Sequence, residues 1–184
     1  MDEGIGGWVA TRAFLSGDRL ALVDGNRRLT YAELDRNIDQ LARALRALGV
    51  RQGDRVAGLL LNSTAFLETM LATAKLGAVF VPMNVRLGPA EVAYLLVDSG
   101  SDTFVYSAPL APVARAAVTA DGVRVRSRLV VGGEAGEGEF GYEEVLASGE
   151  PRPVVPDVYI RQDRSRRSTS LSTGRGSPLA RTSS

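Results

Sequence analysis

The residues best suited to bind a phosphate lie near the C-terminus, in the run T-S-L-S-T-G-R at residues 169–175. Hydroxyl side chains, backbone N–H groups and a nearby arginine at this spacing can surround a phosphate. The same composition is typical of a polar tail that does not fold. The residue types alone leave both interpretations open for the candidate phosphate-binding residues, which are Thr169, Ser170, Ser172, Thr173 and Gly174.

A second candidate is G-E-G-E-F-G at residues 136–141, which fits the G-x-G-x-x-G pattern of dinucleotide-binding turns. It follows a predicted strand and precedes a predicted helix, as such a turn requires. However, Glu134, Glu137 and Glu139 would bring negative charge close to a pyrophosphate. We therefore interpret this segment as a surface loop.

Other charged residues could act in acid–base chemistry if they were buried. Asp98 with Asp102, and Glu143 with Glu144, are the closest carboxylate pairs considered, but neither lies in a segment predicted to be buried. Lys75 could be a buried amine near the end of a predicted helix. The attraction of its charge to the negative end of the helix dipole is the simpler explanation.

The composition excludes several classes of site. The 184 residues include no cysteine and no histidine, which rules out disulfides, thiolate metal sites, cysteine nucleophiles and the Ser-His triad. The first residues lack the pattern of a signal peptide. No apolar run approaches the roughly 20 residues that span a bilayer. We expect a soluble cytoplasmic protein with no membrane span and no metal ligand set of its own.

The charge is unevenly distributed along the chain. The net charge is +1, but residues 151–184 hold seven basic and two acidic side chains, whereas residues 1–150 are acidic overall. A basic tail can bind nucleic acid. Because no aromatic residue follows Tyr159, a surface on which bases could stack is missing there. We interpret the tail as solvated and predict no nucleic-acid partner.

The N-terminal elements must position any site further along the chain. The pattern predicts a helix over residues 5–15 and a hairpin whose strands, 19–24 and 27–29, meet at the Gly25-Asn26 turn. Thr30 and Glu33 form a capping-box pattern. An apolar stripe then predicts a helix that ends at Gly49.

Strands and helices alternate after this helix. Residues 55–61 and 78–81 read as buried strands on either side of an apolar helix at 64–76, which Ser63 would cap. This βαβ unit predicts a mostly parallel sheet covered on both faces, and therefore an α/β fold. Further elements of the same kind are predicted at residues 89–97, 103–106, 109–118, 128–131 and 142–147.

The alternation stops near Ile160, where we place a domain boundary. Residues 1–160 would form one α/β domain. Residues 161–184 contain only Leu171 and Leu179 as large apolar side chains, which is too little apolar surface to offset the entropy of ordering. We expect this basic tail to be disordered.

Four segments, which follow one another along the chain in the order and at the spacing typical of the family, resemble AMP-forming acyl-CoA synthetases. These are the adenylate-forming, AMP-binding ligases. The four segments are L-T-Y-A-E-L-D (29–35), G-D-R-V-A-G-L-L-L-N-S (53–63), A-K-L-G-A-V-F-V-P-M-N (74–84) and residues 86–106. The resemblance runs from about residue 15 to about residue 158 and covers only part of that family's N-terminal domain. It implies activation of a carboxylic acid, such as a fatty acid, by ATP, followed by thioester formation with CoA; Mg²⁺ is expected with the ATP.

The same resemblance implies a phosphate loop of the form T-S-G-T-T-G-x-P-K-G. Thr169, Ser170, Thr173 and Gly174 match it, and Ser172 replaces a threonine conservatively. The loop departs from the pattern at its glycine, proline, lysine and last glycine, where the chain has Leu171, Gly176, Ser177 and Pro178. The tail is then either a degenerate phosphate loop or a chance match.

Most of the family's catalytic motifs have no counterpart in these 184 residues, so we predict a truncated synthetase without ligase activity of its own. A shift of reading frame near Ile160 would explain why the pattern stops there. The alternative is a non-catalytic interaction module, or pseudoenzyme remnant, whose exposed sheet is covered by a partner protein.

Overall fold

The centre of the molecule is a five-stranded sheet in a computed structural model that describes residues 5–147. The strand order is β4-β3-β5-β6-β7, and each strand is parallel to its neighbours. This confirms the predicted α/β fold with a mostly parallel sheet. The strands are β3 (Arg55–Leu59), β4 (Val79–Pro82), β5 (Thr103–Ser107), β6 (Ser127–Val131) and β7 (Phe140–Gly141).

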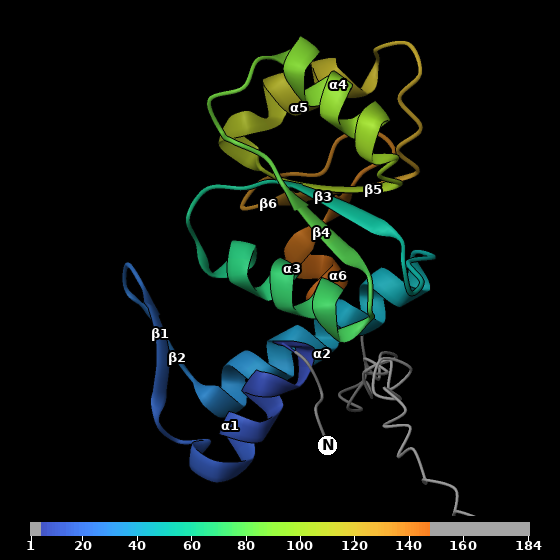
Figure 1. The fold of residues 1–184 in the computed structure, drawn as a ribbon. Coiled ribbons are helices and arrows are strands. Elements are labelled where there is room, and N and C mark those ends of the chain that lie inside the picture. The colour runs from blue at the N-terminus through green and yellow to red at the C-terminus, as the bar shows by residue number, and fades with distance from the viewer. Residues whose placement is uncertain (1–4, 148–184) are drawn as a thin grey trace, which may run out of the picture.

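Helices cover both faces of this sheet, as Figure 1 shows. Above the sheet in that view lie α4 (Pro89–Ser99) and α5 (Ala111–Val118), the latter preceded by the short η2 (Ala108–Leu110). Below it lie α2 (Tyr31–Ala47), α3 (Thr64–Lys75) and α6 (Tyr142–Ala147). Two covered faces explain why the strands read as continuous apolar runs rather than as alternating ones.

The two faces of the sheet contribute to two separate cores. In β5, Val105 packs into the core shared with α2 and α3, whereas Phe104 and Tyr106 pack into the core beneath α4 and α5. All five residues of β5 are buried. Successive side chains of a strand point to opposite faces, so one continuous apolar strand supplies both cores.

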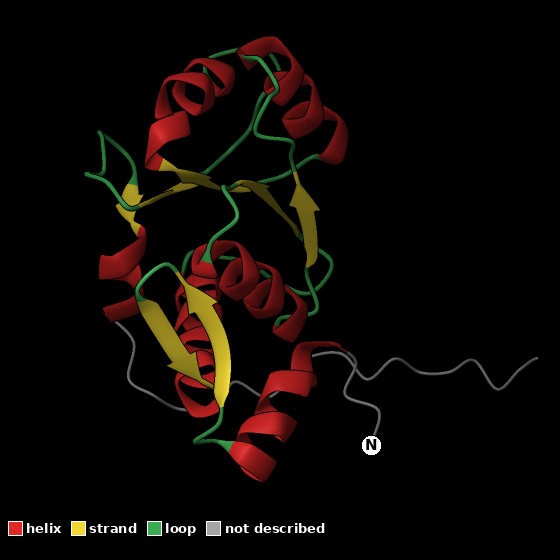
Figure 2. Ribbon diagram, turned by 90° about the vertical axis from the view of Figure 1, so that its left-hand side faces the viewer, coloured by secondary structure: helices red, strands yellow, loops and turns green. Residues whose placement is uncertain are grey.

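The N-terminal elements form a unit beside α2 and α3. It comprises η1 (Ile5–Gly7), α1 (Trp8–Ser16) and the antiparallel strands β1 (Leu20–Asp24) and β2 (Arg27–Thr30), which form a sheet of their own (Figure 2). The turn at Gly25 has a φ of 56°, which glycine adopts without strain. This confirms the predicted hairpin.

The predicted side-chain cap is present at the N-terminus of α2 but absent at the N-terminus of α3. The capping box of α2 is present, since Glu33 N donates to Thr30 Oγ1 and Thr30 N donates to Glu33 Oε2. Ser63 is the N-cap residue of α3, as predicted, but its side chain makes no capping hydrogen bond. Ser63 Oγ donates to the Leu61 carbonyl, and the N-terminus of α3 is capped from β1 instead.

Two predictions concern residues that the structure does not describe. The boundary near Ile160 and the proposed disorder of residues 161–184 both lie outside residues 5–147 and stay predictions. Within the described residues, no helix combines the length and apolar character needed to cross a membrane.

Candidate functional site

The predicted phosphate-binding residues lie outside the described part of the chain. This holds for Thr169, Ser170, Ser172, Thr173 and Gly174, whose role stays a prediction. The described residues nevertheless show the edge of the sheet at which a fold of this kind binds a ligand. They also show that carboxylates of the chain itself accept hydrogen bonds from backbone N–H groups that could bind an anion.

The carboxyl edge of the large sheet is the candidate functional site. From β3 the chain passes to β4 on one side, whereas β5 returns to the other side of β3, so the strand order reverses between β3 and β5. Open parallel sheets bind ligands at the carboxyl ends of the strands where this reversal occurs. Here Leu61 N donates to Ser107 Oγ over 3.1 Å, joining the two strand ends, and Asn62 is exposed beside them.

The N-terminus of α3 opens onto the same edge, and a carboxylate of the chain caps it. Thr64 N and Thr64 Oγ1 donate to Asp24 Oδ2 at 2.7 and 2.9 Å. These two hydrogen bonds lower the pKa of Asp24, because they stabilise its charged form. A helix N-terminus attracts anions. Since Asp24 takes that position, α3 has no free N-terminus for a phosphate.

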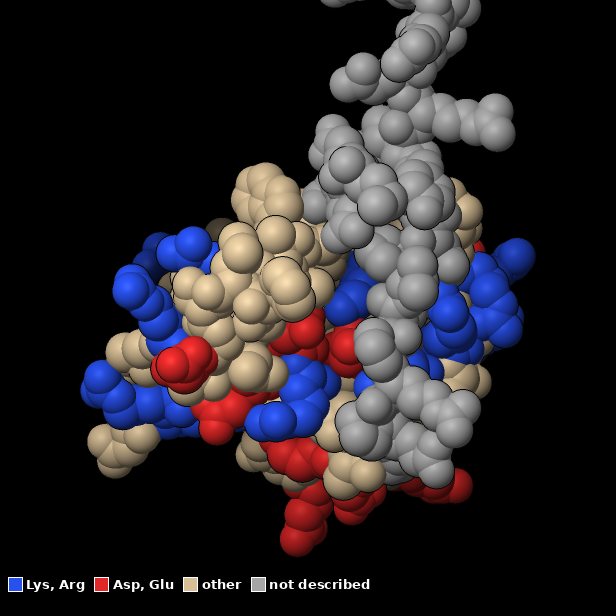
Figure 3. All heavy atoms as spheres, turned by 90° about the horizontal axis from the view of Figure 1, so that it is seen from below, with Lys and Arg blue, Asp and Glu red and all other residues tan. Residues whose placement is uncertain are grey.

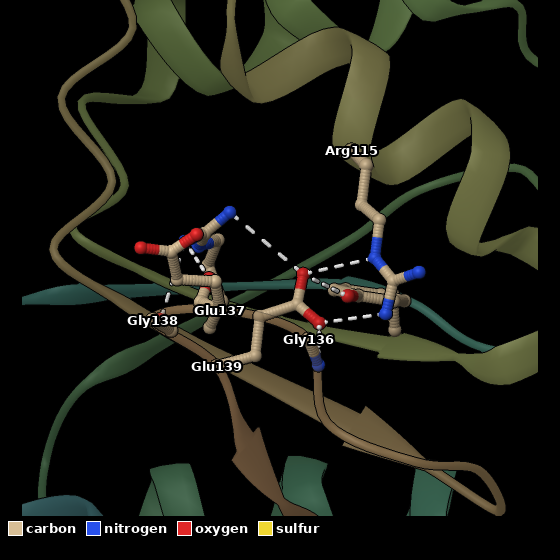
Figure 4. A network of polar contacts seen from close by, with 7 residues as sticks. Arg115, Gly136, Glu137, Gly138 and Glu139 are labelled. Atoms are coloured by element: carbon tan, nitrogen blue, oxygen red, sulfur yellow. Dashed lines mark hydrogen bonds and ion pairs between the residues drawn. The ribbon is translucent and has the colours of Figure 1, made fainter.

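In the loop at residues 136–141, the carboxylate of Glu139 accepts hydrogen bonds from the loop backbone and from neighbouring side chains, as Figure 4 shows. Gly136 N donates to Glu139 Oε2 over 2.7 Å, and Arg115 Nη2 donates to the same oxygen over 2.8 Å. Tyr106 OH and Arg115 Nε donate to Glu139 Oε1 at 2.5 and 3.2 Å. The Glu139 side chain is 1% exposed. The Glu139 carboxylate thus takes up the Gly136 N–H group, which is then not free to bind a phosphate.

This network shifts the ionisation of its members. Burial alone would raise the pKa of Glu139, but the hydrogen bonds from Arg115 and Tyr106 outweigh it and lower the pKa to about 2. Burial and the hydrogen bond to Glu139 raise the pKa of Tyr106 to about 12. The prediction of a surface loop is right for Glu134 and Glu137, which are exposed, and wrong for the buried side chain of Glu139.

Replacing Glu139 with Gln should lower the free energy of unfolding by about 2 kcal/mol at pH 7, because the amide cannot neutralise Arg115. A folded-state pKa below the unfolded value means that the carboxylate stabilises the fold above roughly pH 4.5, and that this contribution declines as the pH falls toward 2. Wild type should therefore lose more stability between pH 7 and pH 3 than Glu139→Gln does. Urea unfolding at both pH values measures this difference.

Glu137→Gln is the matched control, because it removes an exposed carboxylate two residues away. It should follow the wild-type pH dependence. Equal stabilities of Glu139→Gln and wild type at pH 7 would show that the network contributes nothing to the fold.

Lys75 is a buried amine, which was one of the two possibilities, and the helix dipole is not its main partner. Its side chain is 4% exposed and forms an ion pair with Asp39, whose side chain is 9% exposed. Asp35 Oδ1 lies 3.5 Å from Lys75 Nζ. Burial raises the pKa of Asp35, an effect that the Lys75 charge opposes. The buried amine therefore joins α3 to α2 and does not face the carboxyl edge.

A second buried charge, Glu68, lies in the middle of α3 and is 0% exposed. Tyr142 OH donates to its Oε2 and Asn37 Nδ2 donates to its Oε1, both over 2.8 Å. Arg27 Nη2 of the hairpin is 3.6 Å from Oε1. Glu68 was not predicted to be buried, although a lone glutamate in the middle of a mostly apolar helix was a usable signal.

The carboxylates considered as acid–base pairs do not form a catalytic pair. Glu143 and Glu144 are exposed, as predicted, and Asp98 is exposed as well. Asp102 forms an ion pair with Arg126. Within residues 5–147 there is no group of three or more acidic side chains that could hold a metal ion.

Comparison with known proteins identifies the class of this domain. The AMP-binding enzyme family matches residues 9–163. Feruloyl-CoA synthase from an Amycolatopsis species is 47% identical over 106 residues, which are 58% of this chain and 22% of that protein. The long-chain-fatty-acid–CoA ligase FadD13 of Mycobacterium tuberculosis is 43% identical over 113 residues, covering 60% of this chain and 22% of the ligase.

Solved structures agree with the sequence matches. The inhibitor-bound N-terminal domain of FACL13 from Mycobacterium tuberculosis superposes with a TM-score of 0.75 at 34% identity, over 85% of this chain and 38% of that structure. An anthranilate CoA ligase shares the fold with a TM-score of 0.75 at 23% identity. The chain thus belongs to the AMP-binding enzyme family. It spans about a fifth of the length of the curated relatives that it matches.

Proposed function

We propose that this chain is part of an AMP-forming ligase that activates a carboxylic acid with ATP and transfers the acyl group to the thiol of CoA. The observation that carries this proposal is the match of the AMP-binding enzyme family to residues 9–163. Acyl-CoA and aryl-CoA ligases are among the relatives. In such a reaction the protein aligns the carboxylate with the α-phosphate and neutralises the charge that develops there.

The proposed substrate is a carboxylic acid whose acyl or aryl group the described residues do not specify. Fatty-acid metabolism was the expectation from sequence. The relatives include both a long-chain-fatty-acid ligase and a synthase named for ferulic acid, an aromatic acid. We therefore keep the class at carboxylic acids. A cytoplasmic location is also proposed, because ATP and CoA are both available there.

The described residues do not fit an ATP site by themselves. Two groups of backbone N–H donors could bind a phosphate, at the N-terminus of α3 and in the loop at residues 136–141. Asp24 accepts from the first and Glu139 from the second, so both already bind carboxylates of the chain. We propose that phosphate binding falls to the degenerate loop formed by Thr169, Ser170, Ser172, Thr173 and Gly174. Residues 5–147 would then act as the scaffold for that loop, and the Mg²⁺ expected with ATP would find its ligands outside them.

The purified 184-residue chain should form no acyl-adenylate, because the loop lacks its lysine at Ser177 and the described residues supply no phosphate cradle. The test incubates the chain with ATP, Mg²⁺ and either ferulate or a long-chain fatty acid, and measures release of pyrophosphate. Detection of an adenylate would overturn the prediction of inactivity.

A chimera separates the proposed family function from the inactivity of the short chain. In it, residues 5–147 replace the corresponding part of the FACL13 ligase. Because the scaffold would be shared, we expect the chimera to retain measurable adenylation. An inactive chimera that is folded and binds ATP would argue against this chain being a ligase scaffold.

A second candidate function is a non-catalytic interaction module that pairs with another protein. The observation in its favour is the concentration of exposed apolar side chains near the N-terminus of the described chain. Both candidate functions are compatible with an α/β domain at residues 1–160 followed by a basic tail at residues 161–184. We therefore retain this domain division as a proposal.

A further inference from the structure

The loop at residues 60–63 joins β3 to α3 at the carboxyl edge of the large sheet, on the left in Figure 1. Hydrogen bonds from two other elements hold it. Leu61 N donates to Ser107 Oγ of β5 over 3.1 Å, and Thr64 N, directly after the loop, donates to Asp24 Oδ2 of β1 over 2.7 Å. The loop is therefore attached to both sheets of the described chain.

The contact between the loop and Ser107 follows from the pairing of β3 with β5. The two strands are parallel neighbours with Leu59 opposite Tyr106, so the chain just beyond β3 passes beside the last residue of β5. Ser107 is 5% exposed. Ser63 Oγ donates to the Leu61 carbonyl over 3.2 Å, so both polar backbone groups of Leu61 are bonded. Polar side chains that are buried generally have a specific partner, which here is the loop backbone.

Asn62 is the polar residue that this fixed loop presents to solvent. It is exposed, and its side chain has no hydrogen-bond partner within residues 5–147. Its backbone lies between Leu61 and Ser63, whose contacts restrict the loop on both sides. A carboxamide can both donate and accept hydrogen bonds. Binding residues are often exposed polar side chains on loops that a rigid scaffold positions.

The surface charge does not by itself mark a binding face. Seen from below, basic and acidic side chains lie close together around an apolar area, in the part of that face that is not drawn in grey (Figure 3). A field of one sign would steer an anionic substrate over a distance, whereas mixed charges largely cancel. Short-range hydrogen bonds at the carboxyl edge, where the strand order reverses, are then what can orient a substrate.

We propose that Asn62 is a binding residue of the ligase reaction and that Ser107 is its positioning residue. Asn62 Nδ2 donates a hydrogen bond to an anionic oxygen of the substrate, which belongs either to the carboxylic acid or to a phosphate of ATP. Ser107 does not touch the substrate. Its hydroxyl holds Leu61 N and thereby fixes the backbone of Asn62, which lowers the entropy lost when the substrate binds. This inference rests on the proposed function for the reaction that the two residues serve.

Hydrogen exchange of the 184-residue chain tests the positioning role without any activity. Ser107→Ala should speed exchange of the Leu61 amide about fivefold, because the amide loses its acceptor. Ser107→Thr keeps a hydroxyl and should exchange as wild type does. Ser101→Ala is the matched control, since Ser101 is 2% exposed, precedes the other end of β5 and contacts the Ser99 hydroxyl instead. Unchanged exchange at Leu61 in Ser107→Ala would overturn the positioning role.

The kinetics of the FACL13 chimera test the binding role. Asn62→Ala should lower kcat/KM of adenylation about tenfold. Its unfolding midpoint should not change, because the side chain is exposed. Ser107→Ala should lower kcat/KM as well, Ser107→Thr should restore it, and Ser101→Ala should leave it unchanged. Asn26→Ala, at an exposed position of the hairpin turn, is the control for Asn62 and should be as active as the unmodified chimera.

The two possible sources of the anionic oxygen give different results. A rise in the KM of the carboxylic acid alone would assign the hydrogen bond to its carboxylate, and a rise in the KM of ATP alone would assign it to a phosphate. An active chimera that Asn62→Ala leaves equally active would reject the role of Asn62 and keep the ligase function. A folded but inactive chimera would reject the ligase function and the role of Asn62 with it, whereas exchange at Leu61 would still decide whether Ser107 fixes the loop.

Discussion

Replacing Glu68 with Ala should lower the free energy of unfolding by about 3–5 kcal/mol. The side chain is 0% exposed, and it accepts hydrogen bonds from Tyr142 and Asn37 at 2.8 Å. Its removal leaves the buried Tyr142 hydroxyl without an acceptor and opens a cavity between α3, α2 and α6. Arg27 of the hairpin loses its ion-pair partner as well.

Glu68→Gln tests whether size or charge carries this effect. The amide fills the same space and keeps one acceptor oxygen, so a loss of about 1–2 kcal/mol is expected. Glu144→Ala, at an exposed position on α6, should change stability by no more than about 0.5 kcal/mol. Urea unfolding of the three variants decides the matter. A Glu68→Ala protein as stable as Glu144→Ala would show that the network is not needed.

Replacing Lys75 with Met should lower the free energy of unfolding by about 3 kcal/mol, because Asp39 would keep a buried charge without its ammonium partner. Both side chains are less than one tenth exposed. A buried ion pair is often replaceable as a whole, whereas loss of one partner is costly. The double variant Asp39→Asn/Lys75→Met should therefore be more stable than Lys75→Met alone.

A double-mutant cycle on Asp39 and Lys75 measures their coupling, for which we expect about 2 kcal/mol. Arg36→Met removes an exposed cation from α2 and serves as the control, with little change expected. Additive effects of the two substitutions would mean that Asp39 and Lys75 do not stabilise one another in solution.

The sequence alone determined the order and kind of the elements. The apolar strands β3 and β4, on either side of an apolar helix, predicted a parallel sheet, because strands that lack alternation are covered on both faces. The Thr30–Glu33 capping box is a pattern spanning three residues, so it is readable without a structure. The family resemblance rested on the same segments, which position a site rather than perform its chemistry.

The candidate site could be predicted only in part. The phosphate-binding residues from Thr169 to Gly174 came from local composition and a family pattern, and they stay a prediction. The carboxyl edge at Leu61 and Ser107 depends on strand order, which no local pattern contains. Asp24 caps α3, which begins 40 residues later in the chain. Because a local pattern does not show so distant a carboxylate, the side-chain capping role was assigned to Ser63, whose hydroxyl donates to the Leu61 carbonyl instead.

The tertiary structure alone decided which charges are buried and which apolar side chains are not. Glu139 was interpreted as part of a surface loop, and the charge of Lys75 was explained by the helix dipole, because a sequence shows a charge but not the partner that neutralises it. Arg115 lies 24 residues from Glu139, and Asp35 lies 40 residues from Lys75. Periodicity reports the local direction of a side chain, whereas burial of a charge depends on chain segments that meet only on folding. For the same reason the apolar residues of α1 predicted a helix but not that its apolar side chains would be left exposed.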